Sequence, residues 1–272
     1  MIFKNLKSLM LLGSIRRLGL EWLLPYMASS DQVNARVYNY NYTTEMMKER
    51  LQRGSDQHDF WDNVLLHEDK KTGMSRDEMT SNASNLVLAG SETTATLMSG
   101  CIYQLCKNPE VQRLAAKEIR EAFTSDQDID LFSTSQLKYT LAVLEETMRI
   151  YPPVPTQTNR TVPAGGDTVM GQYLPAGTTI SLPQYIAHHY PPYWTKAEEF
   201  HPERFLGAEE FKNDNFEVMQ PFSVGPRNCI GRNLAYSEMR LILARFLWNF
   251  DVELDEERME GREWTDQKTF VL

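Results

Sequence analysis

Apolar residues recur at helical intervals along most of the chain. Leu141, Leu144 and Met148 share one face of a helix predicted for residues 138–150, which ends before two prolines. The same spacing predicts further helices over residues 1–65, 75–107, 109–124 and 230–248. Residues 154–180 instead show short segments between glycine and proline turns, which predicts strands. The expected fold is mainly α with small β-sheets, an α+β class.

Capping residues mark two helix starts. Ser75 and Glu78 form a capping box at the start of the long helix over 75–107. Ser133 or Thr134 is expected to cap the helix over 138–150. Apolar and acidic residues alternate over 250–254, which predicts one more strand.

Composition and charge narrow the function classes. With 42% hydrophobic residues among 272, the chain can bury a sizeable core, as one globular domain or part of one. A formal net charge of −9 argues against a nucleic-acid partner, because phosphate binding needs clustered Lys and Arg. Three cysteines without paired spacing argue against a disulfide framework. Residues 2–27 mix leucines with charged residues, so the segment is not expected to span a membrane. It is expected to be either a helix that faces the core or one that contacts a membrane surface.

The strongest chemical signal is the loop that contains Cys229. Gly225 and Gly231 allow this loop to turn tightly and to lie against a flat partner. A helical pattern begins at Ile230, so Cys229 is expected just before a helix N-terminus, where free amides and the helix dipole favour a thiolate. Arg227 adds a cation that can pair with a carboxylate. We therefore predict that Cys229 is a metal ligand.

Three other readings of Cys229 compete with this one. A phosphatase-like nucleophile would need arginine at position 235, where the chain has Ala235. A zinc site would need further ligands at suitable spacing, and Cys101 and Cys106 lie far upstream on a predicted helix. A buried structural cysteine is the usual role of a lone Cys, and only the residues around it argue otherwise.

Those surrounding residues resemble a known family. The run Phe222-x-x-Gly225-x-Arg227-x-Cys229-x-Gly231 is similar, at every fixed position, to the haem-thiolate loop of the cytochrome P450 family. The resemblance implies haem b (iron protoporphyrin IX) as cofactor, with Cys229 as the axial ligand of its iron. It also assigns the other four residues of the run to cofactor binding.

A second motif lies inside the long predicted helix. Residues 89–94 place an Ala-Gly pair, a serine, an acid and two threonines within an apolar stretch, against helix propensity. Read alone, such a segment is typical of close helix packing. It resembles the family's oxygen-binding groove, which implies that Glu92 and Thr93 are catalytic residues that guide protons to dioxygen.

A third and a fourth motif predict a structural triad. Glu146 and Arg149 lie three residues apart, a spacing that on an exposed helix is worth only ~0.2–0.5 kcal/mol. The residues from Glu146 to Pro155 resemble the family's Glu-x-x-Arg helix and its proline exit, and residues 201–205 resemble its later arginine motif. The resemblance therefore implies a buried triad of Glu146, Arg149 and Arg204 that supports the cysteine loop.

Two features are expected to face the cofactor and the substrate. Arg160 matches the place where the family commonly holds a haem propionate, so it would form a two-cation clamp with Arg227; a solvated strand arginine is the alternative. Residues 154–158 fall where family members line the substrate cavity. Thr156, Gln157 and Thr158 would make that wall polar.

Together the motifs imply a haem-dependent monooxygenase that inserts one atom of dioxygen into an apolar organic substrate, with electrons from an NADPH-dependent flavin reductase. The pattern is most similar to fungal members that act in secondary-metabolite biosynthesis. Family members are longer than this chain, so residues 1–272 are expected to be a partial haem domain, the C-terminal half, without the N-terminal anchor and first helices. The alternative is a truncated, catalytically incompetent remnant. The family resemblance implies the cytosolic face of the endoplasmic reticulum membrane, although no transmembrane segment is predicted here.

Overall fold

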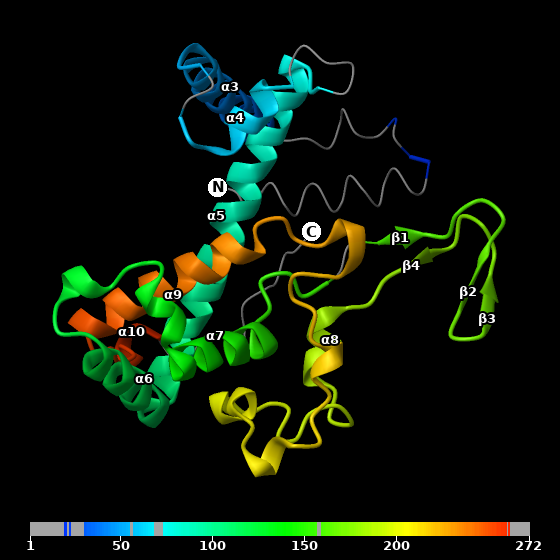
Figure 1. The fold of residues 1–272 in the computed structure, drawn as a ribbon. Helices are drawn as coiled ribbons and strands as arrows, with labels where there is room; N and C mark the ends of the chain where they lie inside the picture. Colours follow the sequence, from blue (N-terminus) through cyan, green and yellow to red (C-terminus); the bar gives the residue numbers. More distant parts are fainter. Residues whose placement is uncertain are drawn as a thin grey trace. The chain divides into compact units, whose positions relative to one another are not determined.

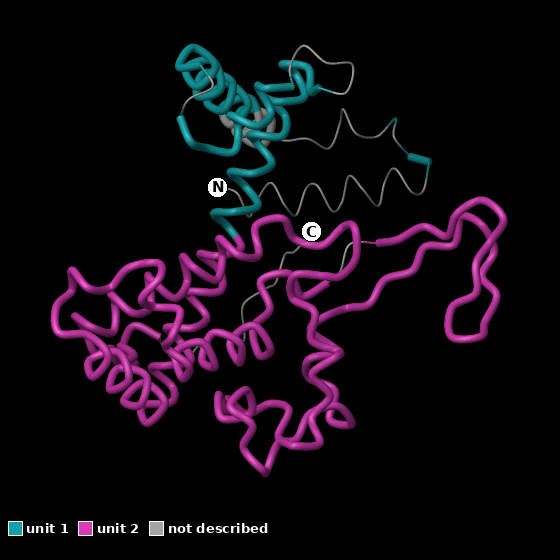
Figure 2. The backbone as a smooth tube through the Cα atoms, viewed as in Figure 1, with its two compact units in different colours: residues 1–92 teal, residues 93–272 magenta. Residues whose placement is uncertain are grey.

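Helices dominate the regular structure. The computed structural model describes residues 19–20, 22, 30–54, 57–67, 73–156, 159–259 and 261. Within these residues the only sheets are two small two-stranded ones (Figure 1). The predicted fold class is therefore confirmed. The chain divides into two compact units, residues 1–92 and 93–272 (Figure 2).

The described part of the first unit contains helices α3 (Ser30–Gln52) and α4 (Phe60–Leu65) and the first turns of α5 (Arg76–Lys107). Arg50 joins α3 to α4, because its guanidinium donates to Asp59 Oδ1 at 2.7 Å and also binds Asp62. Asp59 in addition accepts the amide of Trp61 as the α4 N-cap, and the Arg50 hydrogen bond lowers its pKa. Most of residues 2–27, including the segment considered for membrane contact, lie outside the described residues.

Helix α5 starts at the predicted capping box. The Ser75 amide donates to Glu78 Oε2 at 2.8 Å, and the Glu78 amide donates back to Ser75 Oγ at 3.3 Å. The helix continues without a break through residues 89–94. Ser91 accommodates its hydroxyl there by donating to the carbonyl of Val87 at 2.7 Å, one turn earlier.

The core of the second unit lies where α6 (Pro109–Ala122), α7 (Lys138–Ile150) and α9 (Arg232–Asn249) pack on one another. Each helix contributes fully buried side chains to this core, including Ile119, Leu144 and Leu243. The helices predicted over 109–124, 138–150 and 230–248 are confirmed, with ends within two residues of those expected.

The remaining elements of the second unit are short. Strand β1 (Arg160–Thr161) pairs antiparallel with β4 (Thr179–Ile180), and β2 (Asp167–Val169) pairs with β3 (Gln172–Leu174). Helices α8 (Gln184–His189) and α10 (Glu256–Met259) are single short segments. The irregular stretches contain 3-10 turns at Asp126–Asp128, Ser133–Gln136, Pro202–Leu206, Glu209–Phe211, Phe216–Val218 and Gly225–Arg227.

The predicted cap of α7 is wrong. Ser133 and Thr134 belong to a 3-10 turn, and the N-cap position of α7 is Leu137, which offers no side-chain acceptor. The carboxylate of Glu118, on α6, instead accepts the amides of Tyr139 and Thr140, each at 2.8 Å. A tertiary contact thus satisfies the free amides that a local hydroxyl was expected to satisfy.

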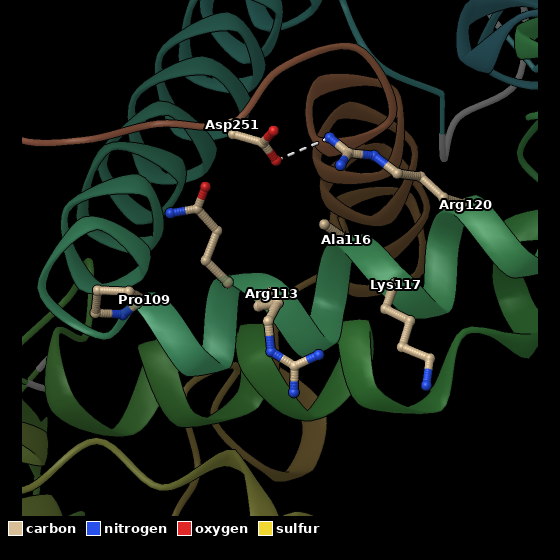
Figure 3. A pocket seen from close by; sticks show the side chains of 7 residues that line it. Pro109, Arg113, Ala116, Lys117, Arg120 and Asp251 are labelled. Carbon is tan, nitrogen blue, oxygen red and sulfur yellow. Dashed lines mark hydrogen bonds and ion pairs between the residues drawn. The ribbon is translucent and has the colours of Figure 1, made fainter.

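The predicted strand over 250–254 is also wrong. The main chain of Val252 pairs with the side chain of Gln112 instead of with a strand. Gln112 Nε2 donates to the Val252 carbonyl at 2.9 Å, and the Val252 amide donates to Gln112 Oε1 at 2.8 Å. Arg120 holds the same segment by pairing with Asp251 at 2.9 Å (Figure 3). It also donates to the carbonyl of Leu247, near the end of helix α9 (Arg232–Asn249), at 2.8 Å. Alternation alone did not reveal that the hydrogen-bonding partner is a helix.

Gly100 allows α5 to pass close to Tyr151, the C-cap of α7. A Cβ at position 100 would lie 2.4 Å from Tyr151 Cδ1, whereas at Gly90 no described atom lies within 4 Å of the corresponding position. We expect Gly100→Ala to destabilise the protein by about 1–3 kcal/mol through overpacking. Gly90→Ala on the same helix should stabilise it by up to ~1 kcal/mol. Urea unfolding of both variants tests this, and equal shifts at the two positions would contradict the close contact.

Candidate functional site

Cys229 lies on an exposed loop immediately before α9. Helix α9 begins at Arg232, and its N-cap is Gly231, whose carbonyl accepts the amide of Ala235 at 2.8 Å. The Cys229 amide donates to the Phe222 carbonyl at 2.8 Å, which closes the loop. Cys229 therefore lies just before a helix N-terminus, as predicted.

The backbone of this loop is in part left-handed. Gly225 has a φ of +77°, which glycine adopts without strain, and it explains the glycine at this position. Ser223 has a φ of +58°, which is uncommon for a residue with a Cβ. The loop must therefore be held in shape by its contacts with the rest of the unit.

A cavity of about 230 Å³ opens in front of this loop. The loop contributes Cys229, Arg227 and Phe222 to its wall, and α5 contributes Thr93 and Thr94. The other lining residues are Leu97, Met148, Pro153, Val154, Gln184, Pro221, Ser223, Ala235 and Met239. Eight of these fourteen residues are apolar, and the six polar ones carry a thiol, a guanidinium, a primary amide and three hydroxyls, two from threonine and one from Ser223.

The structure brings some of the predicted site residues together and not others. Cys229, Arg227, Phe222 and Thr93 line one cavity. Glu92 is half-buried and precedes Thr93 in α5, but it belongs to the first compact unit.

Arg160 lies exposed on β1, opposite Ile180, and is not among the residues described as lining the cavity. Of the predicted substrate wall, Val154 lines the cavity, whereas Gln157 and Thr158 lie outside the described residues.

The predicted triad residues meet in the interior of the second unit. Arg149 donates to both oxygens of Glu146 at 2.8 Å, and Arg204 Nε lies 3.2 Å from Glu146 Oε2. The side chains of all three are fully buried. Buried charges are tolerated only when they are paired and hydrogen-bonded, so this arrangement differs from the exposed pair considered from spacing alone.

The network is larger than the three predicted residues. Arg204 Nη1 also binds Asp214, whose other oxygen accepts the Thr195 amide at 2.8 Å. Two arginines thus face two carboxylates, and the buried charges balance. The indole of Trp194 lies 5.3 Å from the Arg149 guanidinium carbon, a cation–π distance. Asp214 and Trp194 were not identified from the sequence, because the irregular stretch around them has no periodic pattern.

Arg149 also fixes main-chain positions around the network. Its Nη1 donates to the carbonyls of His188 at 2.9 Å and Ala197 at 2.6 Å, and its Nη2 donates to that of Glu199 at 2.9 Å. His188 itself is fully buried, and burial lowers its pKa to about 4. The described residues contain no cluster of three His, Cys, Asp or Glu side chains that could hold a metal ion.

Gln184 links this network to the cysteine loop. Helix α8 carries His188 at its C-terminal end and Gln184 at its start. Gln184 Nε2 donates to the carbonyl of Gln220 at 2.8 Å, the residue before the loop begins at Pro221. The triad therefore reaches the loop through α8, a connection that the sequence did not reveal.

A second, more open pocket of about 480 Å³ lies along α6 (Figure 3). Its three basic residues are already engaged: Arg113 pairs with Glu110 at 2.6 Å, Lys117 with Glu121 at 3.8 Å and Arg120 with Asp251 at 2.9 Å. The chemistry predicted from the sequence therefore points to the cavity beside Cys229.

No helix within the described residues is long and apolar enough to cross a membrane.

The fold and the site define a class of protein: a mainly helical domain in which a cysteine loop before a helix and threonine hydroxyls line the same cavity. Comparison with known proteins identifies the family: the cytochrome P450 family matches residues 15–272. The chain belongs to the cytochrome P450 family.

Three relatives illustrate the similarity. Averantin hydroxylase of Dothistroma septosporum is 47% identical over 98% of this chain and 51% of its own length. Versicolorin B desaturase of Aspergillus parasiticus is 46% identical over 100% of the chain and 55% of its own length. Cytochrome P450 monooxygenase stcF of Emericella nidulans is 44% identical over 96% and 54%. The chain thus spans about half the length of the curated relatives it matches.

Removing one member of the buried charge network should destabilise the protein strongly. We expect Arg204→Met to cost about 3–5 kcal/mol, because Asp214 would be left as a buried, uncompensated charge and Glu146 would lose one of its two arginine partners. Arg113→Met, which removes an exposed ion pair, should cost less than about 1 kcal/mol. Chemical denaturation of both variants measures the difference. Similar losses would mean that the network is not buried in solution.

Proposed function

We propose that this chain carries the haem-binding and oxygen-activating part of a monooxygenase that acts on an apolar organic substrate. The observation that supports it best is the single cavity onto which Cys229, Arg227 and Phe222 converge with Thr93 and Thr94. Family membership supports the same reading. The alternative is a remnant without activity.

The residues around the cavity fit haem b. Its apolar ring suits walls formed by Leu97, Met148 and Val154, and a lone thiol is a suitable axial ligand for its iron. Arg227 would pair with a haem carboxylate, and Arg160 is proposed as the second cation. Gly225 and Gly231 would keep the loop free of side chains on either side of the sulfur. Haem, when bound, would supply the redox chemistry that activates dioxygen.

The protein's own contribution would be to hold, shield and deliver protons. The loop and the α9 amides would keep the Cys229 sulfur negatively charged. The apolar walls would limit access of water. Thr93 holds a hydroxyl at the cavity wall, where it can pass a proton, and we assign Glu92 as its acidic partner. Glu146, Arg149 and Arg204 are assigned a structural role.

The wider context is proposed from the family. We propose that residues 1–272 correspond to the C-terminal half of a haem domain, and that the electron donor is an NADPH-dependent flavin reductase. The relatives' names refer to hydroxylation of averantin and desaturation of versicolorin B, which supports a role in fungal secondary-metabolite biosynthesis. A site on the cytosolic face of the endoplasmic reticulum membrane is proposed on the same basis.

Haem titration of residues 1–272 tests the cofactor assignment. We expect stoichiometric uptake and a reduced carbon monoxide difference spectrum typical of thiolate ligation. Cys229→Ser should lose that spectrum, because serine does not supply a soft anionic ligand. Cys106→Ser is the matched control, since Cys106 is half-buried on α5 and is not among the residues described as lining the cavity.

Two results would count against the proposal. If Cys229→Ser keeps the thiolate spectrum, the ligand assignment is wrong. If the wild-type chain folds but takes up no haem, the cofactor assignment for residues 1–272 is wrong.

Thr93→Ala tests the proton-delivery role. We expect the fraction of consumed NADPH that yields oxygenated product to fall by about 10²-fold, in line with the loss of one acid–base group. Haem uptake should stay intact. Thr94→Ala, the neighbouring hydroxyl on the same cavity, serves as the comparison. Measuring NADPH oxidation, peroxide and product together checks this; unchanged coupling in Thr93→Ala would contradict the role.

A further inference from the structure

A second set of polar contacts lies behind the cysteine loop, apart from the predicted triad. The hydroxyl of Tyr236, on α9, donates to Glu145 Oε1, on α7, at 2.7 Å. Both groups are partly buried. A hydrogen bond to a carboxylate is stronger than one between neutral groups, so this contact ties the two helices together. Burial raises the pKa of both Glu145 and Tyr236, and the carboxylate adds to the shift of the tyrosine.

The ring of Tyr236 continues this contact to the loop. Its centroid lies 5.1 Å from that of Phe222, at an interplanar angle of 44°. The guanidinium carbon of Arg232 lies 5.9 Å from each of the two rings. Aromatic pairs at this separation add to the energy of simple burial, and the cation adds a further attraction. The orientation of Phe222 is therefore set by α9 and, through Tyr236, by α7.

Phe222 in turn holds Cys229. Its carbonyl accepts the Cys229 amide at 2.8 Å, and both residues line the same cavity. The chain between them contains the left-handed Ser223 and Gly225. A loop with such a backbone keeps its shape only when contacts outside it fix its ends. Phe222 is one of these ends, and its side chain rests on Tyr236.

We propose that Tyr236, held by Glu145, is a positioning residue that fixes Phe222 and thereby the direction of the Cys229 sulfur. Neither Tyr236 nor Glu145 is among the residues described as lining the cavity. Their effect on the metal ligand therefore passes through Phe222. The consequence for an iron ligand rests on the proposed function, whereas the positioning itself does not.

Hydrogen exchange of the Cys229 amide in the chain of residues 1–272 tests the positioning without any cofactor. Tyr236→Phe removes only the hydroxyl, and we expect exchange at Cys229 to become about tenfold faster, because the loop opens more often. Tyr236→Leu, which also removes the ring, should accelerate it further.

The matched control is Tyr139→Phe. Tyr139, on α7, donates to the carboxylate of Glu203 at 2.8 Å, a contact of the same kind at a distance from the loop in sequence. The Tyr139→Phe variant should leave the exchange rate of the Cys229 amide, measured relative to the core amides of α7, the same as in the wild type. Unchanged exchange in Tyr236→Phe, or equal acceleration in Tyr139→Phe, would overturn the proposal.

A second readout uses haem-loaded protein. In Tyr236→Phe we expect a larger share of the reduced carbon monoxide complex to show thiol in place of thiolate ligation, with Tyr139→Phe like the wild type. An identical share in all three proteins would contradict the effect on the ligand. If the wild type takes up no haem, the proposed function fails, and the exchange measurement still decides whether Tyr236 positions the loop.

Discussion

The second unit depends on one buried carboxylate. Glu146 accepts hydrogen bonds from Arg149 and Arg204 and from the amide of His201, in a region from which water is excluded. The buried Glu146 carboxylate is stable only while its partners remain in place, and the buried arginines likewise depend on Glu146. Arg149 also binds main-chain carbonyls, so the charge network determines the course of an irregular segment that has little secondary structure of its own.

This constraint reaches the candidate site by two routes. One runs through α8, where Gln184 binds the carbonyl that precedes the cysteine loop. The other runs through α7 itself, since Glu145, next to Glu146 in sequence, binds Tyr236 beneath Phe222. Both routes meet the loop at its start, at Gln220 and Phe222, through elements that pack against the buried network. Its strained backbone at Ser223 is compatible with an ordered structure for that reason.

Periodicity and motif spacing predicted much of this from the sequence. The helices α5, α6, α7 and α9, the capping box at Ser75 and the place of Cys229 before a helix all depend on local pattern, which sequence displays directly. The predictions that failed depend on distant partners. The cap of α7 comes from Glu118, and Val252 pairs with Gln112. Tyr236 was missed because its partner, Glu145, is far away along the chain. Asp214 was missed because it lies in an irregular stretch without a periodic pattern, although its partner Arg204 is near in sequence.

The pairing of Gln112 with Val252 has a consequence for how this part of the chain can vary. A primary amide can donate and accept at the same time, as a neighbouring strand would, and Gln112 contacts Val252 through main-chain atoms alone. The side chain of Val252 can therefore change without loosening this contact, whereas Asp251 still anchors the segment through its side chain, which pairs with Arg120. Position 112 has no such freedom, since a carboxylate lacks the donor, an ammonium lacks the acceptor, and asparagine is one methylene too short.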